Sequence, residues 1–347
     1  MAKKKIYTMK DLSETIGISR PTLSRYFQNP DSVRPSTSQK IRERLEGVDY
    51  VYNFMATRQN RKSTELIGVI VPHLKDMFFA ALLEAIERHA RGLGYTIMTQ
   101  SSDGDPRIEE HAVRKLRSMN ADGAIVAPLG AASSAGLFQW ACESLPVVFA
   151  DAHPSGEMSC ADFVGTDNSQ SVATLVDYLC RAGDSPCVFL GMPPVNTNAF
   201  EREAAYVAQM RALGHEPHVI EPAGADMSWQ FEAFGHGVMS HHFSQQRYTG
   251  ATVLCANDRI AIGAIRAANE HGLFGTGGKT RGQLRIAGHD DHPLSRFMYP
   301  AITTVAQDVD GIARSAVELL VERIGGKRRG APVRRLLPAR LRLRESA

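Results

Sequence analysis

Short apolar runs alternate with helical stretches over most of this chain, from residue 66 onward. Residues 66–72 are typical of a buried strand, and residues 79–90 repeat apolar side chains at helical spacing. Six further strands are predicted, at 95–100, 123–127, 147–150, 187–190, 252–255 and 285–288. Such alternation predicts doubly wound parallel sheets, in which ligands bind at the carboxyl ends of the strands. No glycine-rich dinucleotide fingerprint follows the first strand.

The N-terminal 25 residues carry a different pattern, which predicts two short helices joined at Gly17. Thr8 can cap a first helix in which Leu12 and Ile16 share one face, and Gly17 can supply a sharp turn. A third helix is expected to begin at Pro35. Its inward-facing residues would be Ile41, Leu45 and Val48.

The second of these helices has the side chains of a DNA-recognition helix. Ser19 would cap it while leaving its hydroxyl and free N–H groups facing a phosphate, and Pro21 fits the first turn. The exposed set is Arg20, Thr22, Ser24 and Arg25. Arginine can bridge O6 and N7 of guanine, and threonine can contact a thymine methyl group. We therefore interpret this helix as one that enters the major groove.

Charge is divided unequally along the chain. Residues 1–62 hold 13 lysine and arginine residues against 6 acidic ones, a net charge of +7, whereas the remainder carries a net charge of −4. A basic head attracts phosphates and binds DNA with salt-dependent affinity. The run Lys3, Lys4 and Lys5 is open to two interpretations, a flexible arm or a solubilising tail.

Length and composition indicate two or three folded units, since 347 residues with 43% hydrophobic content can bury more than one core. No apolar run reaches the roughly 20 residues needed to span a bilayer, and no signal peptide is recognisable. We expect a cytoplasmic, nucleoid-associated protein with no membrane contact. The five cysteines lack metal-type spacing, so buried free thiols are expected, and neither a metal site nor a cofactor is predicted.

The head and the body resemble one known family. Residues 18–25, followed by Asn29-Pro30, Val33, Thr37, Tyr50 and Asn53, are similar to the headpiece of the LacI/GalR-type transcriptional regulators. The body is similar to the effector module of that family in the segments 66–72, 78–79, 121–123, 145–148, 151, 167–168, 202, 256–258, 287–291 and 302–305. The resemblance covers essentially the whole chain.

The resemblance implies three parts. These are a small all-α helix-turn-helix headpiece at 1–52, a hinge helix or linker at 53–62, and an effector-binding and dimerisation module at 63–347. The module would be an α/β, two-lobed structure similar to periplasmic binding proteins, with the chain passing between lobes three times. Lobe 1 is expected at about 66–162 and 293–326, and lobe 2 at about 163–292 and 327–347.

The DNA contacts implied by pattern and resemblance together are Thr8, Ser19, Arg20, Pro21, Thr22, Ser24, Arg25, Asn29, Asn53, Ala56 and Gln59. The chain departs from the family at two of its hinge-region positions. Tyr52 stands where a proline is usual, and Gln59 stands where a leucine usually wedges into the minor groove. Because glutamine wedges poorly, strong kinking of the DNA is in doubt, and a merely flexible linker is the alternative.

The resemblance implies effector contacts at Phe78, Asp151, Arg202, Asn257 and Asp290, and Trp229 is a further candidate for the same site. Their chemistry suits a sugar-like molecule, since carboxylates accept hydroxyl donors, a guanidinium donates in a fork and an aromatic face covers a ring. Structural roles are the alternatives: Asp290 as a loop cap, Arg202 paired with a neighbouring glutamate on its helix, and Phe78 as core. Trp229 or Phe231 could stack on the ligand or simply pack. Lys75 hints at an acidic effector, although a solvated lysine is the simpler interpretation.

Other features carry less weight. The histidines at 236, 241 and 242 lack metal-ligand spacing, and no catalytic constellation accompanies the acidic residues. The basic segment 327–344 interleaves apolar residues and is predicted to be a closing edge strand. No leucine heptads follow it, so a homodimer on a near-palindromic operator is expected. The alternatives are control by a protein partner with a vestigial cleft, and an enzyme with an accessory DNA-binding head.

Overall fold

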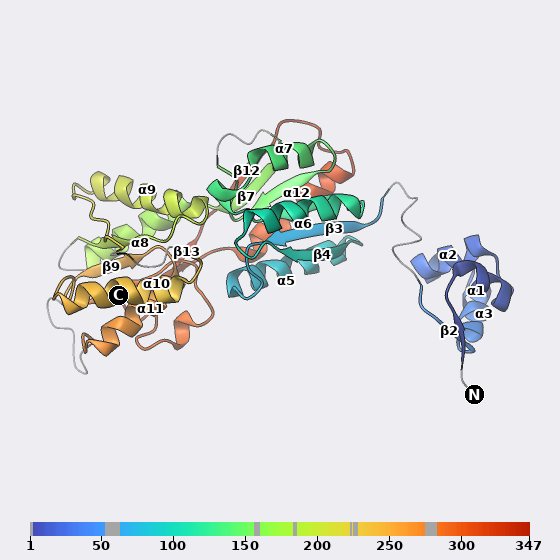
Figure 1. The fold of residues 1–347 in the computed structure, drawn as a ribbon, viewed down its shortest axis with the longest axis horizontal. Coiled ribbons are helices and arrows are strands. Elements are labelled where there is room, and N and C mark those ends of the chain that lie inside the picture. Colours follow the sequence, from blue (N-terminus) through green and yellow to red (C-terminus); the bar gives the residue numbers. More distant parts are fainter. Residues whose placement is uncertain are drawn as a thin grey trace. The chain divides into compact units, whose positions relative to one another are not determined.

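The computed structural model describes residues 3–52, 63–155, 160–182, 186–222, 224, 228–274 and 283–347 (Figure 1). The chain divides into two compact units, Met1–Thr64 and Glu65–Ala347. The predicted hinge segment 53–62, with the candidate DNA contacts Asn53, Ala56 and Gln59, lies outside the described residues.

The N-terminal unit is a helix-turn-helix fold with one added pair of strands. Its elements are β1 (Lys4–Ile6), α1 (Met9–Ile16), α2 (Arg20–Gln28), η1 (Pro30–Ser32), α3 (Pro35–Leu45) and β2 (Val48–Tyr50). Thr8 caps α1 by accepting the N–H of Asp11 at 3.1 Å, and Gly17 ends it in the left-handed conformation at φ 61°. Leu12, Leu23 and Ile41 are fully buried between the three helices, as their spacing predicts.

Two features of this unit differ from the prediction. Lys4–Ile6 is neither an arm nor a tail but a strand, which pairs in parallel with β2, and Ile6 is buried. Val48 accordingly lies in β2 rather than on the inner face of α3. Tyr52, at the position where the family has proline, stacks on Phe27 with ring centroids 4.9 Å apart. The pairing with Val48–Tyr50 and the burial of Ile6 outweigh the charge of the lysine run.

The first lobe of the second unit is built on a six-stranded parallel sheet in the order β12-β7-β6-β5-β3-β4. The strands are β3 (Leu66–Val71), β4 (Thr96–Ser101), β5 (Gly123–Val126), β6 (Val147–Ala150), β7 (Asp162–Thr166) and β12 (Arg334–Leu337). Helices α5 (Met77–Gly92) and α12 (Val309–Ile324) cover one face, and α6 (Pro106–Ser118) and α7 (Ala135–Cys142) cover the other. A short turn, η2 (Gly130–Ala132), precedes α7.

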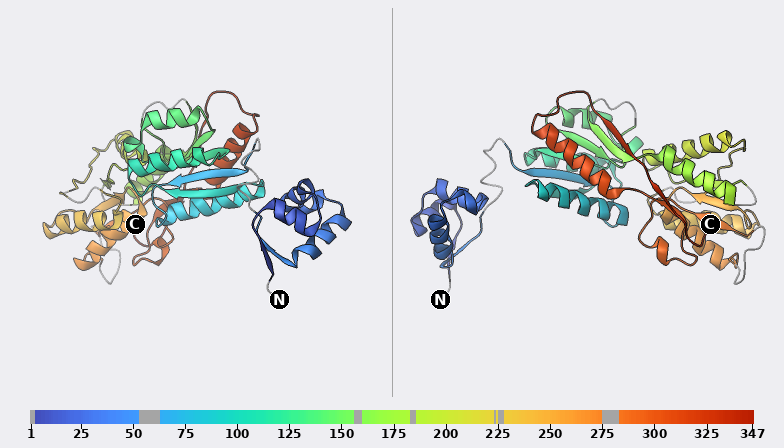
Figure 2. Two further views of the ribbon diagram at one scale, coloured as in Figure 1. Left: turned by 45° about the vertical axis from the view of Figure 1, so that its right-hand side comes forward. Right: turned by 180° about the vertical axis from the view of Figure 1, so that it is seen from behind.

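The second lobe has a three-stranded parallel sheet in the order β10-β9-β8. Its strands are β8 (Val188–Leu190), β9 (Thr252–Cys255) and β10 (Arg285–Ala287), and β11 (Thr304–Ala306) pairs antiparallel with β13 (Arg340–Arg342). Its helices are α8 (Asn168–Ala182), α9 (Thr197–Ala212), α10 (Phe231–Ser244), α11 (Asp258–Glu270) and the short η3 (Ser295–Phe297). Figure 2 shows the C-terminal strands running from one lobe to the other.

The sheets correct the predicted lobe boundaries. The predicted bounds divide β7 at residue 163 and place β12 in lobe 2, but both strands belong to the sheet of the first lobe. The reason is that β12 pairs in parallel with β7, so the basic C-terminal segment first completes the edge of that sheet. Only after Leu337 does it reach the second lobe as β13. The predicted bounds also place residues 293–308 in lobe 1, but β11 pairs with β13, and Thr303 and Ala306 bridge to Ala287 and Asp290 in the second lobe.

The fold class is the predicted one, and each of the six further strands lies within one residue of its predicted bounds. Among the described residues, no helix is long and apolar enough to cross a membrane.

Candidate functional site

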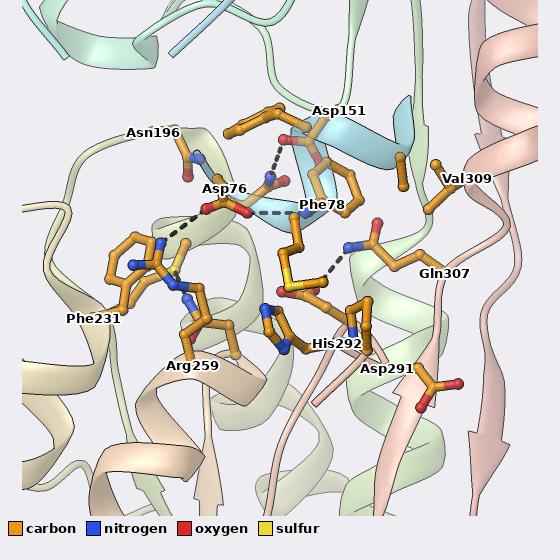
Figure 3. A pocket seen from close by; sticks show the side chains of 18 of the residues that line it. Asp76, Phe78, Asp151, Asn196, Phe231, Arg259, Asp291, His292, Gln307 and Val309 are labelled. Carbon is orange, nitrogen blue, oxygen red and sulfur yellow. Dashed lines mark hydrogen bonds and ion pairs between the residues drawn. The ribbon is translucent and has the colours of Figure 1, made fainter. Parts of the chain in front are cut away.

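A pocket lies between the two lobes, at the carboxyl ends of their strands (Figure 3). Its cavity has a volume of about 140 Å³. The structure brings all six predicted effector residues together in its wall: Phe78, Asp151, Arg202, Trp229, Asn257 and Asp290. Sequence reasoning placed Asp76 in a loop facing the cleft without naming it as a contact, and it missed several other residues of the wall, among them Asn196, Asn198, Arg259, His292 and Gln307.

The buried Arg202 and the half-buried Asp290 form the ionic centre of this pocket. Arg202 points from α9 and its Nη2 lies 3.0 Å from Oδ1 of Asp290, while its Nη1 donates to the backbone oxygen of Ala256 at 2.7 Å. Burial alone would raise the pKa of Asp290, but Arg202 and His289 more than offset it, so this pKa lies below its usual range. Arg202 is thus paired with Asp290, and the alternative of a glutamate on its own helix is wrong.

Hydrogen bonds with neighbouring side chains fix Arg202 and Asp290 in place. Asn168 accepts from Nε of Arg202 at 3.1 Å, and Gln307 donates to Asp290 at 2.7 Å. Burial lowers the pKa of His289 to about 4, so this ring is neutral near pH 7. It contacts Asp290 through Nδ1 at 2.8 Å and Ser171 through Nε2 at 2.8 Å. Both charged groups are therefore held rigidly before any ligand binds.

Asp151 is the pocket carboxylate without an ion pair in the described structure. It follows β6, is 6% exposed, and accepts from the amide of Asn198 at 3.3 Å. Burial raises its pKa to about 7, with Arg202 opposing this and the charge of Asp290 adding to it. Asp151 therefore changes its protonation state near neutral pH. A ligand that donates hydrogen bonds to this carboxylate would favour its ionised form.

Two asparagines at helix starts play different roles. Asn257 caps α11 by accepting the N–H of Ile260 at 2.8 Å, and its amide nitrogen donates to Sδ of Met192 at 3.7 Å, which leaves its second amide N–H for a ligand. Asn196 stands at the N-cap of α9 but makes no side-chain capping bond, and its buried Oδ1 has no hydrogen-bond partner among the described residues. A buried amide oxygen without a donor is costly, which makes it a candidate ligand contact. No sequence pattern marks Asn196, because it lies in a loop between strand and helix.

Aromatic rings form the apolar side of the pocket. Phe78 packs edge-on against Phe79 at 5.3 Å, and Trp229 packs against His73 at 5.1 Å and Phe231 at 5.7 Å. Trp229 therefore both packs and lines the cavity. Lys75 is exposed and is not part of the pocket wall.

The N-terminal unit presents the predicted recognition helix to solvent. Ser19, Arg20, Pro21 and Arg25 are exposed on or next to α2, while Thr22 and Ser24 are half-buried. Ser19 makes no capping bond of its own, and its hydroxyl lies 2.8 Å from that of Thr22, so the first N–H groups of α2 stay available. Thr8 and Asn29 cap α1 and η1, so both have structural roles.

Raising the pH from 5 to 8 is expected to lower the stability of the wild type relative to Asp151→Asn. The folded-state pKa of Asp151 is raised from 3.8 to about 7, so the folded state holds a proton that the unfolded state has lost. That contribution is complete only below the unfolded-state pKa of 3.8, falls as the pH rises, and is lost above about pH 7, so that about 3 kcal/mol is lost between pH 5 and 8. Urea unfolding of both proteins at several pH values measures it, and parallel pH profiles would contradict it.

Comparison with known proteins gives the same two-part division. The chain matches a helix-turn-helix family at residues 1–52 and the periplasmic binding protein-like domain at residues 176–347. It is 28% identical to the transcriptional regulator PtxS of Pseudomonas plecoglossicida, over 98% of this chain and 95% of the relative. Its fold is similar to the lac repressor dimer bound to operator and the anti-inducer ONPF, with a TM-score of 0.81, 23% identity and 99% of each chain covered.

The chain belongs to the LacI/GalR family. It is a DNA-binding transcriptional regulator and not an enzyme. Its fold is also similar to that of the regulator CelR in complex with cellobiose, with a TM-score of 0.66, 20% identity, and coverage of 98% of this chain and 99% of that one. Membership explains why the helix-turn-helix unit and the two-lobed unit occur in one chain.

Proposed function

We propose that this regulator is a repressor that binds a near-palindromic operator as a homodimer, and that a sugar or sugar derivative in the cleft controls its operator affinity. The observation that carries the proposal is the composition of the pocket wall. Fixed acceptors, a buried guanidinium and aromatic rings line the same pocket, as recognition of a polyhydroxylated ring requires. The lac repressor and CelR, whose folds are similar, bind ONPF and cellobiose respectively.

Each pocket residue has a proposed role. Asp151 and Asp290 accept hydroxyl donors, Arg202 and Asn257 donate, and Phe78 and Trp229 cover the ring. Asn196 joins them, because its buried Oδ1 has no hydrogen-bond partner in the part of the chain that the structure describes. No described contact favours control by a protein partner.

At the DNA, α2 is proposed to enter the major groove through Arg20, Thr22, Ser24 and Arg25. Ser19 and Pro21 at the helix start, with Thr8 and Asn29, would contact the phosphate backbone. The contacts proposed for Asn53, Ala56 and Gln59 rest on the family resemblance. A regulator of this kind would act at the nucleoid, in the cytoplasm.

Effector binding is expected to shift the two lobes and to alter the segment between the units, coupling the sites by about 1–3 kcal/mol. The direction of this coupling follows from which lobe arrangement the effector prefers.

The test is a ligand panel of sugars, sugar acids, polyols and nucleosides, with the melting temperature of the full chain as the readout. One class is expected to raise the melting temperature of the wild type. Asn196→Ala should reduce this shift, whereas Asn269→Ala, which changes an amide on the exposed side of α11, should preserve it. If no class shifts the wild type, the sugar assignment is wrong. A shift that Asn196→Ala leaves intact would remove Asn196 from the site.

A further inference from the structure

One ion pair spans the pocket from lobe to lobe and was not among the predicted site residues. Nη1 of Arg259, in the first turn of α11, lies 2.8 Å from Oδ2 of Asp76 in the loop after β3 (Figure 3). Asp76 is 8% exposed, and its other oxygen accepts the N–H of Phe78 at 3.0 Å, which caps α5. The pair therefore ties the start of a first-lobe helix to the start of a second-lobe helix.

Arg259 is anchored within its own lobe independently of Asp76. Its Nε and Nη2 form a fork with the carboxylate of Glu232 on α10, both at 2.7 Å, and its guanidinium lies 5.0 Å from the centre of the Phe231 ring. Helices α10 and α11 approach so closely that a Cβ at Gly263 would clash with the backbone oxygen of Glu232, so only glycine fits there. The fork leaves one edge of the guanidinium, Nη1, directed across the cleft.

Two of the three passages between the lobes lie on the other side of the first-lobe sheet from this pair. Strands β7 and β12 lead into those passages, whereas β3, which Asp76 follows, lies next to the opposite edge strand β4. The third passage runs through Gln307 to Val309, and both residues belong to the wall of the same pocket. A second contact reinforces the ion pair: Trp229 of the second lobe packs against His73, and a Cβ at Gly104 would lie 3.1 Å from the Trp229 ring. The ion pair and the Trp229 contact therefore both resist separation of the lobes.

We propose that Asp76 and Arg259 form a charge latch that holds the two lobes closed at the mouth of the cleft and sets the equilibrium between open and closed forms. Two carboxylates share Arg259, so opening the cleft leaves it paired with Glu232 and exposes Asp76 to water. The open form of the protein can therefore be populated, because opening leaves neither charge buried without a partner. The importance of the latch for effector response rests on the proposed function, but the latch itself does not.

The Asp76–Arg259 pair also limits the size of the ligand that can enter the cleft. The cavity of about 140 Å³ is smaller than the roughly 300–1,000 Å³ of most ligand sites. An effector larger than the cavity must separate Asp76 from Arg259 to enter. Removing the latch is thus expected to speed both association and dissociation of such an effector.

Trp229 gives a direct readout of the latch. The chain has two tryptophans, and replacing Trp140 with phenylalanine leaves Trp229 as the sole emitter. In that background, Asp76→Asn keeps a helix-capping side chain but removes the charge. We expect acrylamide quenching of Trp229 to increase at least twofold. Asp310→Asn, which breaks an exposed ion pair with Arg88 within the first lobe, is the matched control and should leave quenching unchanged.

A second variant tests the ion pair from its other side; because Nη2 of Arg259 also donates to the backbone oxygen of Trp229 at 3.4 Å, only quenching equal to that of Asp76→Asn supports the latch. Arg259→Gln removes the opposite partner, and it should raise quenching to the same level as Asp76→Asn. The double variant should be no more open than either single one, because the same interaction is lost. Unchanged quenching in both single variants, or additive effects in the double variant, would overturn the proposal. Neither outcome would bear on the ligand panel, so the two hypotheses fail separately.

Discussion

Replacing Arg202 with alanine is expected to destabilise the effector module by about 3–5 kcal/mol and to abolish the effector response. The guanidinium is 3% exposed and makes hydrogen bonds or ion pairs to Asp290, Asn168 and the backbone of Ala256. Alanine would leave the half-buried carboxylate of Asp290 without its cation. Urea unfolding followed by tryptophan fluorescence measures the cost, because both tryptophans lie in the second unit.

The matched variant combines Arg202→Ala with Asp290→Asn. Because this second change removes the stranded charge, it should recover part of the lost stability without restoring the response. Wild-type stability in Arg202→Ala would show that the ion pair contributes little to the fold. A wild-type effector response in that variant would place the effector outside this pocket.

Replacing Arg25 with alanine is expected to weaken operator binding by about 1–3 kcal/mol and to relax base preference at one position of each half-site. Arg25 is exposed on α2, and the hydrogen bonds described for it involve its backbone oxygen. Its side chain is therefore available for a base edge. Selection from random DNA followed by fluorescence anisotropy would supply both the operator and the affinities.

The control for Arg25→Ala changes a basic residue outside the recognition helix. Arg42 is exposed on α3 and carries the same charge, so Arg42→Ala should not change base preference. Equal weakening by Arg25→Ala on operator and random DNA would instead make Arg25 a phosphate contact.

Periodicity and turn chemistry predicted the fold well where local physics decides it. Gly17 adopts the left-handed conformation that its place between two amphipathic segments requires. The strands of the parallel sheets appear where apolar runs predicted them, since both faces of such sheets are buried. The lysine run at 3–5 did not indicate a strand, because β1 depends on its pairing with Val48–Tyr50.

Nonlocal pairing also explains the errors in the lobe boundaries. Arg334–Leu337 carries a strand pattern, but nothing within those four residues specifies β7 as the neighbour. Prediction of the pocket residues is limited in the same way, by contacts between residues that are distant in the sequence. Five of the pocket's six predicted residues came from family resemblance and Trp229 from its capacity to stack on a ligand, whereas Asp76 and Arg259 become a pair only because two lobes meet across a cleft.

The most direct test of the central claim is the operator affinity of the full chain, measured by fluorescence anisotropy with and without the effector that raises its melting temperature. The proposed account predicts that saturating effector changes the dissociation constant by about 5–150-fold, corresponding to 1–3 kcal/mol of coupling. The Arg202→Ala variant should show the effector-free affinity under both conditions. An operator affinity of the wild type that is identical with and without bound effector would contradict ligand-controlled DNA binding.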